Sequence, residues 1–277
     1  FEQGVYRLML NRETGSRGAE TEGSLQGEEN PIVFGEWTEA ALGEGTYRVC
    51  FVDEGGKINL KWVDEETLQR VFSNLGIEQD RIGVLVDSIL DWRDEDDLHR
   101  LNGAEKDYYL ALSPPYGAKD GPFDTVEELL WVKGMTRDLF YGYEEEGTRR
   151  VGLREIFTVD GRHRRVNLLT TSAAVCQALL GQSLEECEKF VQERKDLSED
   201  TISDLLDLLG RGSGESAVRQ FTRAKPSVVS IEAVGYLGGS KLRRRLRGVV
   251  RLLGGSQGFS MIRWVDWSGE NYHCEES

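Results

Sequence analysis

The chain has 277 residues, of which 39% are hydrophobic and 30% carry a charge, and this is enough apolar material to bury the core of one large domain or two. Its net charge of −15 repels phosphate backbones, which disfavours general nucleic-acid binding and favours cations and basic protein surfaces as partners. No run of eighteen apolar residues occurs, and the first residue is Phe1, so we expect that an N-terminal piece containing any membrane segment has been removed.

The cysteines do not mark a site by their spacing. There are four, Cys50, Cys176, Cys187 and Cys274, which are too few for a disulfide-dense scaffold and lack the short C-x-x-C spacing of a zinc site. The sequence leaves open whether one disulfide forms, because that depends on the compartment.

The N-terminal part changes character along its length. Residues 1–10 carry apolar side chains at the spacing of a helix end that enters from upstream. Residues 11–31 are rich in Gly, Glu and Ser, which is typical of a solvated loop. β-Branched and aromatic residues over 45–62, interrupted by Glu54-Gly55-Gly56, then predict a β-hairpin.

Two helices are predicted next. Asp64 has the side chain of a helix N-cap, and apolar residues recur after it at helical spacing as far as Leu75. A second apolar stripe runs from Ile82 to Leu90, and the helix that it predicts ends in an acidic loop.

A weak internal repeat at an offset of 47 residues aligns TVEELLWVKGMTRDLF with SAAVCQALLGQSLEEC. In both copies an apolar helix is predicted to stop at a glycine, Gly134 or Gly181, that adopts the left-handed cap conformation. Thr136 and Ser183 are then predicted to cap the next helix. Each copy is therefore expected to be a helix-hairpin-helix-like unit.

A further amphipathic helix is predicted over 202–209, and strand character returns in the last sixty residues. The strands at 228–237, 241–253 and 259–267 are expected to form a meander. The order strands, helices, strands predicts an α+β fold in which both strand regions join one antiparallel sheet and the helices form a large insertion.

The acidic loop is the strongest candidate for a site. Its carboxylates are those of Asp91, Asp94, Glu95, Asp96 and Asp97, followed after a turn by those of Glu105 and Asp107. Water and salt stabilise such a cluster if the side chains diverge, and a bound cation does so if they converge. Calcium suits carboxylate oxygens on an irregular loop, whereas zinc would need His or Cys. The residues alone leave a calcium site and a solvated acidic loop both open.

Other function classes find less support. His99, His163 and His273 lie in no metal or nucleophile motif, and no G-x-S-x-G, P-loop or dinucleotide fingerprint occurs. The chain is therefore expected not to be an enzyme, and a secreted enzyme using carboxylates is the third hypothesis.

The alternative function is a calcium-stabilised helix-hairpin-helix DNA-binding protein, because such units offer backbone amides to a phosphate. Each hairpin here has a single glycine, however, and the second copy carries Glu185, Glu186 and Glu188, which repel phosphate.

Several motifs, in order, resemble one family, the minor pseudopilin K of the type II (general) secretion pathway. They are VDEGGKINLKW (52–62), ILDWRDEDD (89–97), NGAEKDYY (102–109), PPYGAKDGPFDTVEELLWVKGMTRDLFYG (114–142), GLREIFTV (152–159) and VNLLTTSAAV (166–175). The resemblance implies a pilin-like N-terminal helix and antiparallel sheet interrupted by a large α-domain. On this basis residues 1–63 hold the helix remnant and first strands, residues 64–225 the inserted α-domain, and residues 226–277 the remaining strands.

The resemblance also implies a function. Family members lie at the pseudopilus tip with the minor pseudopilins I and J, where they initiate assembly and limit pilus length, with no enzyme activity and no nucleic-acid partner. They are bacterial inner-membrane proteins, anchored by an N-terminal helix that is absent from this chain, with the region present here in the periplasm.

The resemblance further implies one or two structural calcium ions in the α-domain. The implied ligands, carried over by position, are Asp91, Asp94 and Asp96 in the pattern DWxDxD, and Glu105 and Asp107 in the pattern GAExD. Asp120 is a weaker candidate, because relatives often have Asn there.

Overall fold

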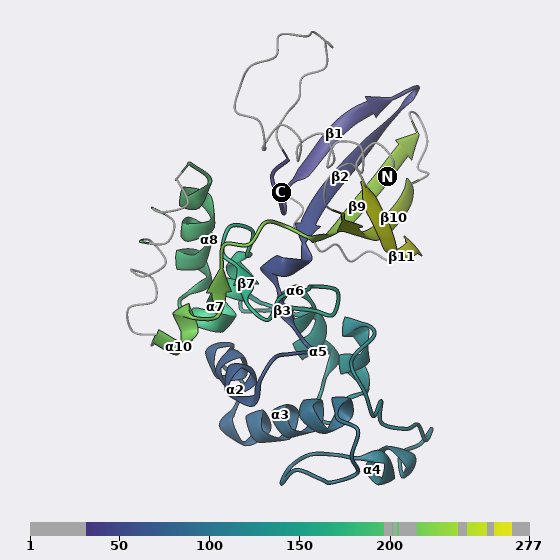
Figure 1. Ribbon diagram of the computed structural model, residues 1–277, viewed down its shortest axis with the longest axis vertical. Helices are drawn as coiled ribbons and strands as arrows, with labels where there is room; N and C mark the ends of the chain where they lie inside the picture. Colours follow the sequence, from purple (N-terminus) through teal and green to yellow (C-terminus); the bar gives the residue numbers. More distant parts are fainter. Residues whose placement is uncertain are drawn as a thin grey trace. The chain divides into compact units, whose positions relative to one another are not determined.

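The structure, a computed structural model, describes residues 32–196, 201, 204, 215–237, 243–253 and 258–267 (Figure 1). The helix end and the loop predicted over 1–31, and the amphipathic helix predicted over 202–209, therefore fall wholly or mainly outside the described residues. The chain divides into two compact units. One takes in the described residues up to Glu54 and from Pro226 onward, and the other spans Gly55–Lys225.

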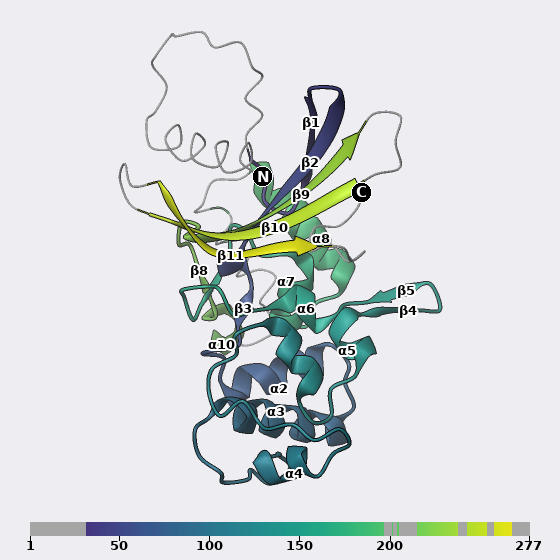
Figure 2. The same cartoon turned by 90° about the vertical axis from the view of Figure 1, so that its right-hand side faces the viewer.

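The first unit is an antiparallel sheet. Among the described residues it has five strands in the order β1-β2-β9-β10-β11 (Figure 2). The strands are β1 (Trp37–Leu42), β2 (Gly45–Asp53), β9 (Val228–Leu237), β10 (Arg243–Leu252) and β11 (Phe259–Trp267). Strands β9, β10 and β11 pair in succession, and β2 pairs with β9. The predicted meander and the predicted joining of the two strand regions in one sheet are both confirmed.

Apolar side chains from both strand regions form the core of this sheet. The core residues are Val49, Phe51, Val229, Ile231 and Val250. Val49 and Phe51 lie two positions apart, as do Val229 and Ile231, so each pair points to one face of its strand. The register places Phe51 opposite Ile231, which brings the two pairs together across the sheet.

A buried charge network lies within the same sheet unit. Arg247 is 3.4 Å from the carboxylate of Glu54 and 3.9 Å from that of Glu232, and Ser230 donates a hydrogen bond to Glu54. Both carboxylates are buried, and a buried carboxylate needs a partner of this kind.

The predicted hairpin over 45–62 is wrong. Residues 54–56 form the 3-10 turn η1 (Glu54–Gly56), and β3 (Ile58–Asn59) pairs in parallel with β6 (Phe157–Thr158). The physical reason is tertiary: the hydrogen bond from Ser230 holds Glu54 in the sheet unit. A Cβ on Gly56 would lie 2.9 Å from the carbonyl oxygen of Thr170. The glycine thus allows a close backbone approach, and the chain continues into the second unit.

The second unit is mainly helical. Its helices are α2 (Glu65–Asn74), α3 (Gln79–Arg93), α4 (Lys106–Leu110), η2 (Val126–Trp131), α5 (Arg137–Tyr141), α6 (Leu153–Ile156), α7 (Ala173–Leu180), α8 (Leu184–Glu193), η3 (Arg194–Asp196) and α10 (Glu215–Val218). Besides β3 and β6, its short strands are β4 (Tyr143–Glu145), β5 (Thr148–Arg150), β7 (Val166–Asn167) and β8 (Phe221–Thr222). Strands β7 and β8 pair in parallel, so two-residue bridges tie together distant parts of the unit.

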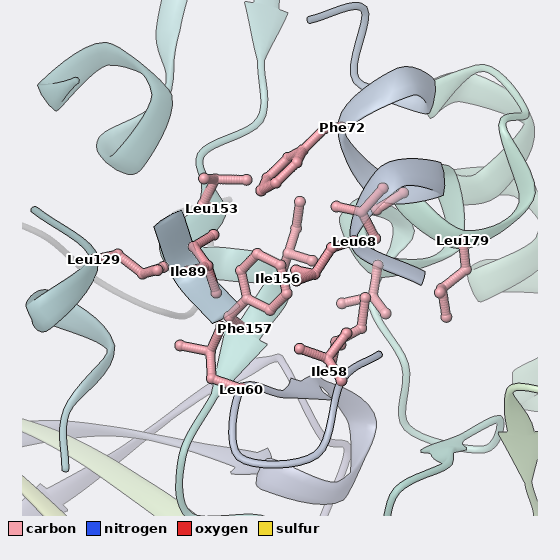
Figure 3. Packing of buried hydrophobic residues seen from close by; sticks show 14 of the residues in the cluster. Ile58, Leu60, Leu68, Phe72, Ile89, Leu129, Leu153, Ile156, Phe157 and Leu179 are labelled. Carbon is pink, nitrogen blue, oxygen red and sulfur yellow. The ribbon is translucent and has the colours of Figure 1, made fainter. Parts of the chain in front are cut away.

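The two helices predicted after Asp64 are confirmed. The Asp64 carboxylate accepts a hydrogen bond from the backbone N–H of Thr67 at 2.8 Å, which caps α2. Leu68 and Phe72 of α2 and Ile89 of α3 are fully buried. Figure 3 shows these side chains converging with others that are distant in the sequence, including Phe157.

The two copies of the internal repeat have different structures. In the second copy α7 ends at Gly181, whose φ of 71° is left-handed. The Ser183 hydroxyl caps α8 by accepting from the backbone N–H of Glu186, and the Glu186 carboxylate accepts from the backbone N–H of Ser183. In the first copy η2 is a 3-10 helix that ends before Gly134, and α5, which Thr136 caps, has five residues. The glycine and cap positions follow the sequence pattern, but the predicted first helix of the first copy is short and 3-10.

No helix within the described ranges combines the length and the apolar character needed to cross a bilayer.

Candidate metal centre

The acidic loop begins where α3 ends, and Arg93 fixes that end. The Arg93 guanidinium donates to the carbonyl oxygens of Leu60 at 2.6 Å and Val63 at 2.7 Å. These bonds tie the last residue of α3 to the segment that follows β3. The hydrogen bonds that the structure describes for this guanidinium are thus made to carbonyl oxygens, and its effect on the neighbouring Asp94 carboxylate is electrostatic.

Three carboxylates converge beyond Arg93. Asp94 is the C-cap of α3, Asp96 lies in the loop, and Glu105 is the N-cap of α4. One oxygen from each lies within 4.8 Å of those of the other two. Asp96 is exposed, Asp94 is half-buried and Glu105 is 2% exposed. The group therefore has one solvent-facing side and one closed side.

The closed side contains oxygens that lack partners. Among the described residues, neither oxygen of the buried Glu105 carboxylate accepts a hydrogen bond, and Oδ1 of Asp94 has none either. An unsatisfied buried carboxylate is costly, and an absent ion is one of the standard reasons for finding one. Oxygens without partners on two side chains that face a third carboxylate form a group that could hold a cation.

The pKa values of these carboxyl groups are raised, as expected for buried oxygens without partners. Burial, followed by repulsion from Asp91 and Asp94, raises the pKa of Glu105 from 4.5 to about 7. Burial also raises the pKa of Asp94, with further increases from Asp96 and Asp91 and an opposing effect of Arg100. The geometry thus disfavours the charged form of these groups unless a positive charge joins them.

Asp91 supports the loop from inside and does not join the group of three. It is fully buried; its Oδ2 accepts from the backbone N–H of Arg100 at 3.2 Å, and its Oδ1 lies 3.4 Å from Nε of Arg100. Burial raises the pKa of Asp91, and these contacts oppose the increase. Gly103 packs against the carboxylate so closely that a Cβ there would lie 1.8 Å from Oδ2.

Asp107 and Asp120 also lie outside the group of three. The Asp107 side chain is 76% exposed, and its Oδ1 lies 2.9 Å from Nε2 of His99. Asp120 has a φ of 51°, a left-handed conformation that Asn and Asp tolerate better than other non-glycine residues. Its charge helps to raise the pKa of Glu105.

Residues far along the chain brace the loop, and sequence reasoning did not single them out. The Lys133 ammonium donates to the carbonyl oxygens of Asn102 at 3.1 Å and Gly103 at 2.9 Å. The backbone N–H of Lys133 donates to the hydroxyl of Tyr109 at 3.2 Å, and the Tyr109 ring packs edge-on against Trp92 at 5.0 Å. Lys133 lies within the stretch 114–142 that carries the resemblance, but nothing in that stretch predicts its bonds to backbone atoms thirty residues earlier.

The chemistry of the donor set selects the ion. Three carboxylates without histidine or cysteine suit a hard cation that prefers oxygen. An irregular loop that supplies unevenly spaced oxygens suits calcium, which accepts six to eight ligands without strict angles, better than magnesium, which demands an octahedron. The three carboxylates present therefore fit calcium better than magnesium or zinc.

The same geometry gives no support to DNA binding. The N-terminus of α8, which would face a phosphate in the second hairpin, carries Glu185 and Glu186 in its first turn. These carboxylates place negative charge where a phosphate would bind.

Comparison with known proteins finds a match to the first part of the helical unit and relatives of similar sequence. Residues 55–144 match the family described as Type II secretion system (T2SS), protein K. The chain is 35% identical to Type II secretion system protein K of Pectobacterium carotovorum subsp. carotovorum over 75 residues, and this alignment covers 27% of the chain and 23% of that protein. It is 39% identical to the Type II secretion system protein K of Klebsiella pneumoniae over 71 residues, an alignment that covers 26% of the chain and 22% of that protein. The matched stretch thus spans less than a quarter of either relative.

The fold likeness reaches much further along the chain. A chain in the crystal structure of the GspK-GspI-GspJ complex from the enterotoxigenic Escherichia coli Type 2 Secretion System superposes with a TM-score of 0.65, covering 84% of each chain at 18% identity. Because the sequence identity is only 18%, this similarity shows a shared fold, which combines sheet and helix.

Proposed function

Because residues 55–144 match the family described as Type II secretion system (T2SS), protein K, we propose that this chain is a minor pseudopilin of a type II secretion system. The observation that carries the proposal is the family match in the helical unit, supported by a fold likeness over 84% of the chain. The protein acts by assembling with other proteins, and we assign it no catalytic step.

The proposed partners are the minor pseudopilins I and J of the same system. The support is the complex in which the similar chain was solved, GspK-GspI-GspJ. The test is to mix the purified chain with its cognate I and J proteins and to measure the mass of the product by light scattering. A 1:1:1 complex is expected, and three separate species at micromolar concentration would contradict the proposal.

We place the protein at the tip of the pseudopilus, in the periplasm, with an inner-membrane anchor. The helical unit adds about 170 residues to the sheet unit, and a subunit of that bulk would obstruct the addition of another subunit above it. Deleting residues 64–225 should therefore give pili of abnormal length or number in cells. Normal pili from that deletion, with the shortened protein present at its usual level, would refute the steric argument.

The acidic loop is proposed to hold a structural calcium ion through Asp94, Asp96 and Glu105. Calcium would neutralise the cluster and supply the partner that the Glu105 oxygens lack. Asp91 is proposed to act behind them by holding the loop through Arg100. Asp107, which pairs with His99 at the surface, is expected to contribute less than sequence position alone implies.

Thermal unfolding with calcium and with a strong chelator tests this site. A ligand that binds only the folded state at a thousand times its Kd stabilises by about 4 kcal/mol, which raises the midpoint by several degrees. The shift should disappear in Glu105→Gln. Asp97→Asn is the matched control, since it removes one charge from an exposed residue outside the converging group. Equal shifts in both variants would mean that calcium acts as a general counter-ion.

A further inference from the structure

The two free cysteines of the helical unit meet inside one helical hairpin. Cys176 lies in α7 and Cys187 in α8, on the two sides of the turn at Gly181. Both are fully buried. The thiol of Cys187 points at that of Cys176 with 2.7 Å between the sulfur atoms. That separation exceeds an S–S bond of about 2.05 Å by well under 1 Å, so a bond needs little movement of either helix.

A second observation concerns the conditions under which this chain folds. Cys50, in the sheet unit, is disulfide-bonded. Disulfides persist in oxidising compartments and are rare where thiols are kept reduced. A chain that carries one disulfide therefore folds where other well-placed cysteine pairs are also oxidised.

The hairpin itself gives the bond a structural role. Of the ten residues of α8, only Cys187 and Phe190 are buried, so few side chains hold this helix against the rest of the unit. On the other side α7 is fixed by Asn74, whose Nδ2 donates to the carbonyl oxygen of Ala178 at 3.0 Å. A covalent link from Cys187 to the well-fixed α7 would secure the helix that has the weaker attachment.

We propose that Cys176 and Cys187 form a structural disulfide that joins α7 to α8 during folding. The oxidant is the disulfide of a thiol–disulfide oxidoreductase, for which oxidised glutathione substitutes in vitro. One cysteine thiolate attacks that disulfide, forming a mixed disulfide and releasing one oxidant thiolate. The other cysteine thiolate then attacks the mixed disulfide, so that the S–S bond forms within the hairpin and the second oxidant thiolate leaves. The chain loses two protons and two electrons, and the oxidant is reduced to its dithiol.

The reaction belongs to folding because the finished hairpin excludes the oxidant. Both sulfur atoms are buried, and the hydrogen bond with Cys176, together with burial, raises the pKa of the Cys187 thiol and suppresses its thiolate. The same burial protects the finished bond from reductants. A mild reductant should therefore leave it intact in the folded chain and cleave it once denaturant is added.

The test is thiol mapping of the whole chain expressed with export to an oxidising compartment. The protein is denatured without reductant, treated with iodoacetamide, digested and analysed by mass spectrometry. The protease must cut between the two cysteines, for example after Glu185 or Glu186. The expected result is that Cys176 and Cys187 are unmodified and that their peptides are joined, with a mass two hydrogens below the sum of the two thiol peptides. Alkylation of both residues before reduction would overturn the proposal, as would a pairing of either with Cys50.

A stability measurement separates this bond from the other disulfide. Reductant in denaturant should lower the unfolding midpoint of the native sequence more than that of Cys176→Ala/Cys187→Ala, because the Cys50 disulfide is common to both proteins. Equal decreases would mean that the hairpin bond contributes nothing. Should the double variant fail to fold, the peptide map of the native sequence decides by itself.

Discussion

The close approach of Gly103 to the Asp91 carboxylate predicts that replacing this glycine by alanine strongly destabilises the loop. Gly103 has no side chain, and a Cβ there would lie 1.8 Å from Oδ2 and 2.7 Å from Cγ of Asp91. These distances are far below van der Waals contact, so Gly103→Ala must displace the carboxylate or the loop. The carboxylate cannot move freely, because it is fully buried and is held by the backbone N–H of Arg100 at 3.2 Å.

The magnitude follows from two contributions. Forcing an extra methyl group into a packed interior costs about 1–3 kcal/mol. Displacing Asp91 from the N–H of Arg100 leaves a buried acceptor unsatisfied, which costs about 1–3 kcal/mol more. We therefore expect Gly103→Ala to lower the free energy of unfolding by about 2–6 kcal/mol. With a urea dependence of about 2 kcal/mol/M the midpoint falls by roughly 1–3 M.

Urea denaturation followed by circular dichroism measures this shift, with Gly117→Ala as the control. A Cβ on Gly117 meets nothing within 4 Å, so that variant should keep its midpoint. Asp91→Ala/Gly103→Ala should lose less than the two single variants together, because the clash is gone when the carboxylate is absent. A midpoint for Gly103→Ala within experimental error of the native value would refute the packing argument.

Three further predictions concern single groups. Glu105 has a pKa of about 7 in the folded chain against 4.5 in the unfolded chain, so the protein with chelator present should lose stability as the pH rises from about 4.5 to about 7. Calcium or Glu105→Gln should flatten this part of the pH–stability curve. A slope that persists in Glu105→Gln would assign the pH dependence to another group. Asp64→Ala removes the cap of α2 and should cost about 1 kcal/mol in urea denaturation, whereas Asp64→Asn, which keeps an acceptor, should cost less. Phe72→Ala empties a fully buried position and should cost about 3–5 kcal/mol, and a loss below 1 kcal/mol would show that the core collapses around the gap.

Periodicity in the sequence was enough to predict the elements that bury a continuous face. Helix α3 carries its apolar side chains at helical spacing over fifteen residues, and β9 is a run of ten residues rich in β-branched side chains. In such elements local propensity and tertiary burial favour the same structure. Their bounds lie within a few residues of the prediction.

Tertiary contacts decided the structure where the prediction failed or was missing. The hairpin β4–β5 is exposed on both strands and therefore has no apolar alternation to detect. Its only local indication is the turn, where Glu146 and Gly147 both have positive φ, as a two-residue hairpin requires. In β10, Arg247 lies within a basic stretch that alternates like an exposed strand face, yet its guanidinium reaches the buried carboxylates of Glu54 and Glu232. Charge patterning does not reveal such a partner, since Glu54 lies 193 positions away.

In the candidate metal centre, too, one part could be predicted from the sequence and another depends on tertiary structure. The composition of the loop predicted a carboxylate cluster, and the resemblance to protein K predicted five ligands within it. The sequence does not tell Asp94, Asp96 and Glu105, which converge, from Asp107, which turns outward to His99. That selection depends on the path of the loop, which Lys133 helps to set by binding the carbonyl oxygen of Gly103.

The balance of charge around the loop explains why a divalent cation, and not salt, should be needed. Asp91, Asp94, Asp96 and Glu105 carry four negative charges when ionised, and the ion pairs that the structure describes for them come from Arg100 alone. Arg93, next in sequence to Asp94, makes its hydrogen bonds to carbonyl oxygens. One positive charge is therefore paired directly with this group of four carboxylates, and one calcium ion would add two more. Sodium chloride screens exposed charges but screens a buried carboxylate such as Glu105 much less. Raising its concentration in the presence of a chelator should therefore not reproduce the stabilisation that we expect from calcium.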